Sequence, residues 1–221
     1  MKLKYHEIIP SSKCILSKIL ENKSRTNPSH EFILTDIKNF TYRDINFNAN
    51  KLAHGLLELS ISKGDKIAVL MDSSPKYLDV WFAISKIGAV EVPINTAYKG
   101  EILIHILNSS DTKLIIFDKK YGHEINKIRE QCPKIETYII EDRNRDFKDY
   151  PIKLDNLYSD NTNDLNIDIK YTDTACLLYT SGTTGVSKGV VMNNHFLWSF
   201  GVNVAQINQI NEFDISYNYL P

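Results

Sequence analysis

Short apolar runs and segments with helical spacing alternate along the middle of the chain, between residues 66 and 140. The run from Ile67 to Met71 has no polar interruption, which is typical of a strand that is buried on both faces. Pro75 directly follows Ser74, and this pair is typical of a capped helix start. Strands are expected at 67–71, 90–94, 114–117 and 137–140, and helices at 75–87, 101–107 and 124–131. This alternation predicts an α/β fold with layered, mainly parallel sheets and flanking helices.

The segment before residue 60 predicts a hairpin followed by a long helix. The runs 32–35 and 40–41 are two short strands around a polar turn. Thr41 and Asp44 have the spacing of a capping box, and apolar residues then recur at helical spacing from Ile45 to Leu59. Residues 141–170, by contrast, are rich in Asp, Asn and Lys and have little periodicity, so we interpret them as a surface connection.

Composition narrows the class of protein without identifying a function. The 221 residues are 43% hydrophobic and 24% charged, which is ordinary for a soluble globular chain. The 26 basic and 27 acidic residues give a net charge of −1, so charge offers no basis for binding nucleic acid. The three cysteines are far apart and lack metal-ligand spacing, which favours reduced thiols. The sequence has no apolar run of membrane-spanning or signal-peptide length, so we predict a cytoplasmic localisation without a transmembrane segment.

The segment with the strongest chemical signal is 179–189, which reads Tyr-Thr-Ser-Gly-Thr-Thr-Gly-Val-Ser-Lys-Gly. Apolar runs flank it on both sides, which predicts a strand, a loop and a second strand. Glycines allow close approach of the main chain to a ligand, and successive N–H groups in such a loop form an anion-binding concavity. Hydroxyl donors and the charge of Lys188 add to this, so the segment suits a polyphosphate.

Two other interpretations apply to a segment of this composition. A cluster of Gly, Ser and Thr between strands is most often a solvated turn. The Walker loop of P-loop NTPases, counted from Gly182, requires glycine at 187 and a hydroxyl residue at 189. The chain has Ser187 and Gly189 at these positions, which disfavours a P-loop NTPase.

The ordered string resembles the signature loop of the adenylate-forming (AMP-binding) enzyme superfamily, which includes acyl-CoA synthetases, luciferases and adenylation domains of peptide synthetases. The family pattern is close to Tyr-Thr-Ser-Gly-Thr-Thr-Gly, any residue, Pro or Ser, Lys-Gly. Residues 179–185, Lys188 and Gly189 match it, with Ser187 where many members have proline. The stretches 64–70 and 81–95 also resemble family segments, and 214–221 resembles a strand that ends in Leu-Pro.

The resemblance implies that residues 1–221 are a partial N-terminal AMP-binding domain. Full-length members continue beyond this point, into a Tyr-Gly-x-Thr-Glu motif, a ribose-binding aspartate and a small C-terminal domain with a catalytic lysine. None of these is found in the chain. We therefore expect the 221-residue chain alone to be inactive.

The resemblance also implies a reaction: ATP-dependent activation of a carboxylic acid as an acyl-adenylate, followed by thioester formation with coenzyme A. Magnesium would bridge phosphate oxygens, and no residue is assigned as a metal ligand. The predicted catalytic residue is Lys188, which would also contact the phosphates. The other residues predicted to bind ATP are Thr180, Ser181, Gly182, Thr183, Thr184 and Gly185.

Within the family, residues 92–100 and Ser187 look most like acyl-CoA ligases of the carnitine, crotonobetaine and fatty-acid type. An amino-acid adenylation domain and a catalytically inactive nucleotide-binding or interaction module stay open as alternatives. Two histidines, His105 and His195, are candidates for a catalytic role. We interpret His105, within a helical pattern, as structural, and His195 as a helix cap or packing residue rather than a catalytic group.

Overall fold

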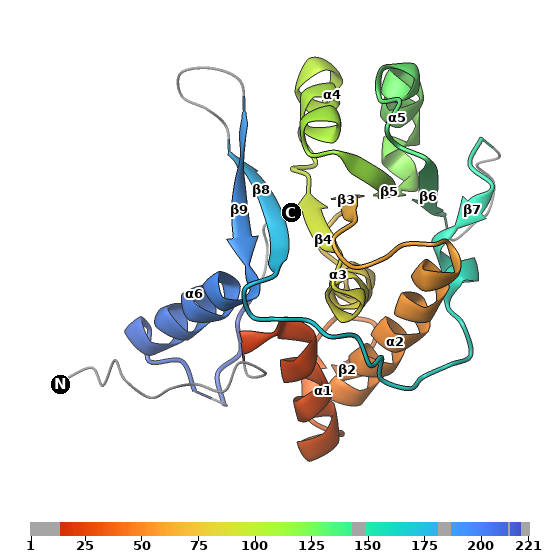
Figure 1. The fold of residues 1–221 in the computed structure, drawn as a ribbon. Coiled ribbons are helices and arrows are strands. Elements are labelled where there is room, and N and C mark those ends of the chain that lie inside the picture. The colour runs from red at the N-terminus through yellow and green to blue at the C-terminus, as the bar shows by residue number, and fades with distance from the viewer. Residues whose placement is uncertain (1–13, 143–148, 181–186, 212, 218–221) are drawn as a thin grey trace.

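A computed structural model describes residues 14–142, 149–180, 187–211 and 213–217. One mixed sheet has the strand order β7-β6-β5-β3-β4-β8-β9, and a separate hairpin pairs β1 with β2 (Figure 1). The strands are β1 (Glu31–Ile33), β2 (Phe40–Thr41), β3 (Lys66–Leu70), β4 (Val90–Pro93), β5 (Thr112–Asp118), β6 (Thr137–Glu141), β7 (Ile152–Lys153), β8 (Thr174–Thr180) and β9 (Lys188–Asn193). The α-helices are α1 (Leu16–Thr26), α2 (Tyr42–Glu58), α3 (Pro75–Ile87), α4 (Gly100–Ser109), α5 (Gly122–Ile128) and α6 (Asn194–Ile207).

Every neighbouring pair of strands from β7 to β8 is parallel, and only the last pair, β8 with β9, is antiparallel within the described sheet. This confirms the predicted α/β fold with a mainly parallel sheet. The chain passes from β3 to β4 on one side and then returns across β3 to β5 on the other. The carboxyl ends of β3, β4, β5, β6 and β8 consequently meet at one edge, which is where open parallel sheets bind their ligands.

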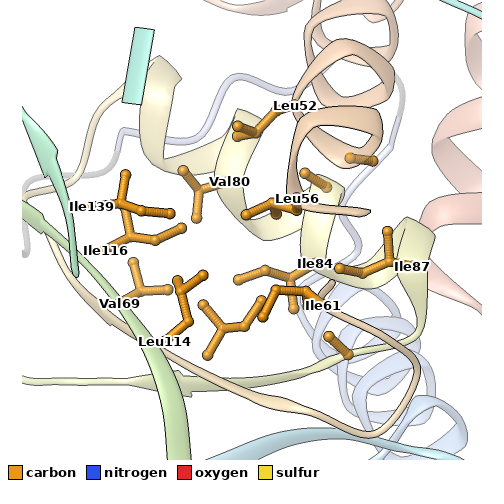
Figure 2. Packing of buried hydrophobic residues seen from close by; sticks show 14 of the residues in the cluster. Leu52, Leu56, Ile61, Val69, Val80, Ile84, Ile87, Leu114, Ile116 and Ile139 are labelled. Carbon is orange, nitrogen blue, oxygen red and sulfur yellow. The ribbon is translucent and has the colours of Figure 1, made fainter. Parts of the chain in front are cut away.

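Two apolar cores cover the two faces of the sheet. Helices α2 and α3 pack on one face, where Val69, Leu114 and Ile139 contribute from three strands (Figure 2). Helices α4 and α5 pack on the other face, against Leu70, Ile115 and their neighbours. Consecutive residues of β3 thus enter opposite cores, which explains why this strand is continuously apolar in sequence.

The helix boundaries follow the local chemistry that the sequence indicated. The Thr41 side chain accepts a hydrogen bond from the Asp44 N–H, and Asp44 accepts one from the Thr41 N–H, which completes the capping box of α2. Ser74 caps α3 through the Tyr77 N–H. Gly88 ends α3 with φ of 69°, a left-handed conformation that side chains with a Cβ disfavour. These features confirm the predicted starts of both helices.

The prediction that residues 141–170 form a surface connection is wrong for part of the described segment. Tyr150 and Leu154 are fully buried, and β7 extends the parallel sheet beside β6. The Tyr150 ring packs edge-on against Phe117 with a centroid distance of 4.9 Å, and its hydroxyl donates to Asn126 Oδ1. These residues enter the core singly, between polar neighbours, so they produce no periodic pattern.

The expected strand at 214–221 is not found in its described part, 214–217. Ile215 and Tyr217 are 78% and 84% exposed, and no strand among the described residues pairs with them. A strand forms only when a neighbouring strand takes up its backbone hydrogen bonds, so strand-like composition alone does not produce one.

A buried carboxylate lies where the hairpin β8–β9 joins the parallel sheet. Glu91 of β4 is opposite Cys176 of β8 and accepts a 2.7 Å hydrogen bond from the Tyr77 hydroxyl. Burial raises the pKa of Glu91 to about 7, although the Tyr77 hydrogen bond acts in the opposite direction. The protonated form of Glu91 is therefore favoured in the folded chain below about pH 7.

This raised pKa predicts a pH-dependent stability. Because the folded-state pKa exceeds the unfolded value, the stabilisation is complete below about pH 4 and is lost as the pH rises through 7. We expect Glu91 to lower the free energy of unfolding by about 2 kcal/mol between pH 5 and pH 8. Glu91→Gln should remove that loss, as measured by urea unfolding at both pH values. An unchanged pH dependence in the variant would contradict this assignment.

The hairpin β8–β9 and α6 expose an unusual amount of apolar surface. Val191 of β9 is 65% exposed, and Phe196, Phe200, Val204 and Ile207 form a stripe along α6 that is 37–79% exposed. These helix residues are spaced at i, i+4, i+8 and i+11, so they share one face. Contiguous apolar surface of this kind is typical of interaction surfaces and promotes association.

We expect the 221-residue chain to self-associate through this stripe. Phe200→Glu/Val204→Glu should shift the chain towards monomer in sedimentation velocity, because both substitutions place charge on the exposed stripe of α6. Gln206→Glu changes the charge of the same helix outside the stripe and should leave association unchanged. Equal effects of the two variants would show that net charge, rather than the apolar stripe, controls association.

Candidate functional site

The segment singled out in the sequence joins the ends of β8 and β9. Thr180, the last residue of β8, is directly opposite Lys188, the first residue of β9. The predicted phosphate-binding residues Ser181, Gly182, Thr183, Thr184 and Gly185 lie outside the described residues. Because β8 is parallel to β4, Thr180 is at the carboxyl edge of the sheet. The two predicted strands on either side of 181–186 are confirmed, and they pair with each other.

The two predicted residues that the structure describes share one face of the hairpin. Directly opposed residues of an antiparallel pair project their side chains to the same side, so Thr180 and Lys188 lie together. Both are exposed. Among the described residues, no hydrogen bond or ion pair engages the Lys188 ammonium. This arrangement leaves a cation and a hydroxyl side by side at the open end of the hairpin.

Tyr179 and Gly189, the neighbouring pair, face the opposite side of the hairpin. The Tyr179 ring covers Gly189 so closely that a Cβ at 189 would lie 3.1 Å from the Tyr179 Cζ atom. The Tyr179 hydroxyl is 2.8 Å from Ser109 Oγ of α4. The tyrosine and the final glycine of the motif therefore form one packing unit, which places the hairpin against α4.

His105 of α4 contacts the other end of the same segment. Its Nε2 is 2.8 Å from the carbonyl oxygen of Ser187, and its ring meets Tyr179 edge-on at 6.3 Å between centroids. The Ser187 hydroxyl in turn donates a 2.6 Å hydrogen bond to the Thr180 carbonyl oxygen. Sequence reasoning placed His105 in a helix but missed this contact, because 82 residues separate it from Ser187.

His195 is a packing residue rather than a helix cap. The cap of α6 is Asn193, whose side chain accepts a hydrogen bond from the Phe196 N–H. The His195 ring lies 6.0 Å from that of Tyr171 and 6.1 Å from that of Trp198. These contacts connect α6 to the segment before β8, and they support the structural interpretation of this histidine.

A separate cavity of about 580 Å³ opens at the same edge of the sheet, beyond the ends of β3, β5 and β6. It lies where the strand order reverses between β3 and β5. Its charged lining is largely paired: Lys120 binds Asp72, Lys76 is 3.5 Å from Glu141, and the Asp72 N–H donates to Asp118 at 2.7 Å. Burial raises the pKa of Asp118, and the Lys120 hydrogen bond lowers the pKa of Asp72. None of the described residues of β8 and β9 lines this cavity.

Two general features of the described chain bear on ligands and location. The described residues gather no group of three His, Cys, Asp or Glu side chains that could hold a metal ion. Within the same residues, no helix combines the length and apolarity needed to cross a lipid bilayer.

Comparison with known proteins supports the motif and the fold. The family model described as AMP-binding enzyme matches residues 20–221. The long-chain-fatty-acid–CoA ligase FadD13 of Mycobacterium tuberculosis is 33% identical over 183 residues, which are 83% of this chain and 34% of that protein. The crotonobetaine/carnitine–CoA ligase of Proteus mirabilis is 28% identical over 199 residues, or 84% of this chain and 36% of the ligase.

A solved structure shares the fold of the chain. The structure of a long-chain-fatty-acid–CoA ligase from Archaeoglobus fulgidus superposes with a TM-score of 0.80 at 21% identity, over 96% of this chain and 44% of the ligase. The chain thus spans about a third of the length of the two curated relatives. Because the family model covers nearly all of the sequence, the chain belongs to the AMP-binding enzyme family.

Proposed function

We propose that this chain supplies the ATP-phosphate-binding hairpin of an acyl-CoA synthetase. The reaction activates a carboxylic acid as an acyl-adenylate and then transfers the acyl group to the thiol of coenzyme A. Loop 181–186 would wrap the β- and γ-phosphates, together with Thr180 and Lys188. The observation that carries the proposal is the placement of the motif: Thr180 and Lys188 face each other at the carboxyl edge of a parallel sheet.

The chemistry explains why donors and a cation are needed at this position. The attacking carboxylate and ATP are both anions, and negative charge accumulates on the pyrophosphate that leaves the α-phosphorus. Oriented N–H and O–H donors with a nearby ammonium stabilise that charge in the transition state. The exposed Lys188 ammonium, which no described residue neutralises, is suited to this role.

Magnesium fits the proposal as an ion held mainly by the substrate. Mg²⁺ prefers oxygen ligands, keeps several waters, and is commonly bound by one or two carboxylates together with substrate phosphates. The described residues contain no group of three His, Cys, Asp or Glu side chains placed so that they could hold a metal ion, so we assign no dedicated ligand set within them. When bound, the ion would neutralise phosphate charge beside Lys188.

The substrate assignment follows from the relatives. FadD13 and the Proteus ligase are named for fatty acids and for crotonobetaine or carnitine. We therefore propose a fatty or carnitine-type acid as the substrate and coenzyme A as the acceptor. An amino-acid adenylation domain with a carrier-protein thiol and a noncatalytic nucleotide-binding module are the alternatives. We propose a cytoplasmic location for the enzyme.

The test is carboxylate-dependent exchange between ATP and labelled pyrophosphate. It uses a polypeptide in which residues 1–221 are followed by the remaining two thirds of such an enzyme, with the 221-residue chain alone as control. Exchange with carnitine, crotonobetaine or fatty acids, followed by thioester formation with coenzyme A, would support the proposal. Exchange with amino acids only would support the adenylation-domain alternative. If none of these acids supported exchange, the noncatalytic module would be favoured. Robust exchange by the 221-residue chain would overturn the expectation that this chain is inactive alone.

A further inference from the structure

We infer that His105 is a positioning residue, which holds the phosphate-binding loop in place through the carbonyl group of Ser187. The inference rests on the proposed function of the hairpin and goes beyond it, because His105 lies on α4, outside the motif. The residues that carry the inference are His105, Ser109, Tyr179, Thr180 and Ser187, which we call the α4 clasp.

The clasp connects the described residues on both sides of 181–186 to α4. On the β9 side, the His105 Nε2–H donates to the Ser187 carbonyl oxygen over 2.8 Å. On the β8 side, the Tyr179 hydroxyl and Ser109 Oγ are 2.8 Å apart. The Ser187 hydroxyl then bridges the two ends, because it donates to the Thr180 carbonyl oxygen over 2.6 Å.

Helix α4 is a firm anchor for these contacts. Leu103, Ile106 and Leu107 of this helix are at most 1% exposed and belong to the core beneath α4 and α5. His105 and Ser109 are four residues apart and share one face of the helix, and both side chains contact the hairpin. Figure 1 shows α4 beside the β8–β9 hairpin. Buried residues thus fix the helix, and its partly exposed face fixes the loop ends.

The geometry also defines what His105 must supply. The Ser187 carbonyl oxygen can only accept a hydrogen bond, so Nε2 must carry a proton. Both the neutral Nε2–H tautomer and the charged imidazolium meet this condition. The role therefore requires a donor at this reach rather than a charge or a proton transfer, and a glutamine amide can replace it.

Thr180 and Ser187 lose less conformational freedom when a polyphosphate binds beside them if α4 already holds them in place, because part of the ordering has already taken place. Loss of one neutral hydrogen bond changes an equilibrium by about five-fold. We expect His105→Leu to weaken binding of MgATP by about five-fold and to accelerate amide exchange in 180–189 by a similar factor. Ser109→Ala should produce the same effect through Tyr179.

His54 provides a matched control. Its Nε2 is 3.1 Å from the carbonyl oxygen of Asn163, so it makes the same kind of bond from a different helix, α2, away from the hairpin. The experiment compares wild type, His105→Leu, His105→Gln, Ser109→Ala and His54→Leu in the 221-residue chain. NMR titrations with MgATP measure affinity, and hydrogen exchange measures local protection.

Faster exchange confined to 180–189 in His105→Leu and Ser109→Ala, with wild-type behaviour in His105→Gln and His54→Leu, would confirm the clasp. Uniformly faster exchange, or the same loss of affinity in His54→Leu, would overturn it in favour of a general stabilising role. Unchanged exchange in His105→Leu would also overturn it. Failure of the wild-type chain to bind MgATP would contradict the proposed function, whereas the exchange comparison would still decide whether His105 holds the loop ends.

Discussion

Lys188→Ala should slow adenylation about a hundredfold, or roughly 3 kcal/mol, which is typical for the loss of one preorganised donor to a developing charge. The effect follows from the position of the ammonium opposite Thr180, where no described residue neutralises it. The expected loss is in the rate of acyl-adenylate formation rather than in carboxylate binding. The measurement is pyrophosphate exchange by a polypeptide that contains residues 1–221 and the remaining two thirds of such an enzyme.

Two comparisons separate this effect from a structural one. Thr184→Ala removes a single neutral hydroxyl from a position outside the described residues, and it should cost only about 1 kcal/mol. Thioester formation from preformed acyl-adenylate should be almost unchanged in Lys188→Ala, because pyrophosphate has already left. Equal losses in the two half-reactions would mean that Lys188 supports the fold of the hairpin rather than the phosphates.

Glu21→Leu should destabilise the chain by about 3 kcal/mol, because it leaves a buried ammonium without its closest partner. The Lys86 side chain is 0% exposed, and its Nζ lies 3.0 Å from Glu21 Oε1 and 3.4 Å from Asp164 Oδ1. Burial lowers the pKa of Lys86, and the two carboxylates oppose that shift. The cluster joins α1 and α3 to the segment before β8, so its loss should appear as a lower urea midpoint of unfolding.

The double variant Glu21→Leu/Lys86→Met removes the buried charge together with its partner. Buried ion pairs can often be replaced by apolar residues of similar volume at little cost, so we expect a stability close to that of the wild type. Asp164 would remain bound by the Asn50 and Asn46 amides at 3.0 and 3.2 Å. If the double variant were as unstable as Glu21→Leu, lost packing rather than an unpaired charge would explain the effect.

Much of the fold could be predicted because its signals are local. The apolar runs at β3, β5 and β6, the capping box at Thr41 and the proline start of α3 each depend on residues within one element. The strand–loop–strand arrangement around the motif was predicted in the same way. The family resemblance supplied the role of the loop, which no periodicity could indicate.

The contacts that sequence reasoning missed join residues that are distant along the chain. His105 meets Ser187 across 82 positions, and Lys86 meets Asp164 across 78. Tyr150 enters the core from a polar segment as a single residue. Such contacts depend on the packing of whole elements, and a single sequence contains no pattern that reports them. The motif can therefore be identified from the sequence, whereas the residues of other elements that contact it can be identified only from the structure.

The proposed function requires that ATP phosphates bind at the end of the β8–β9 hairpin. The most direct measurement is an NMR titration of the 221-residue chain with MgATP, inorganic pyrophosphate and adenosine, with backbone amides as probes. MgATP and pyrophosphate should shift the amides of 180–189, adenosine should leave them unchanged, and Lys188→Ala should weaken the responses to MgATP and pyrophosphate. Shifts centred instead on Asp72, Asp118 and Lys120, around the charged cavity between β3 and β5, would contradict the proposed function.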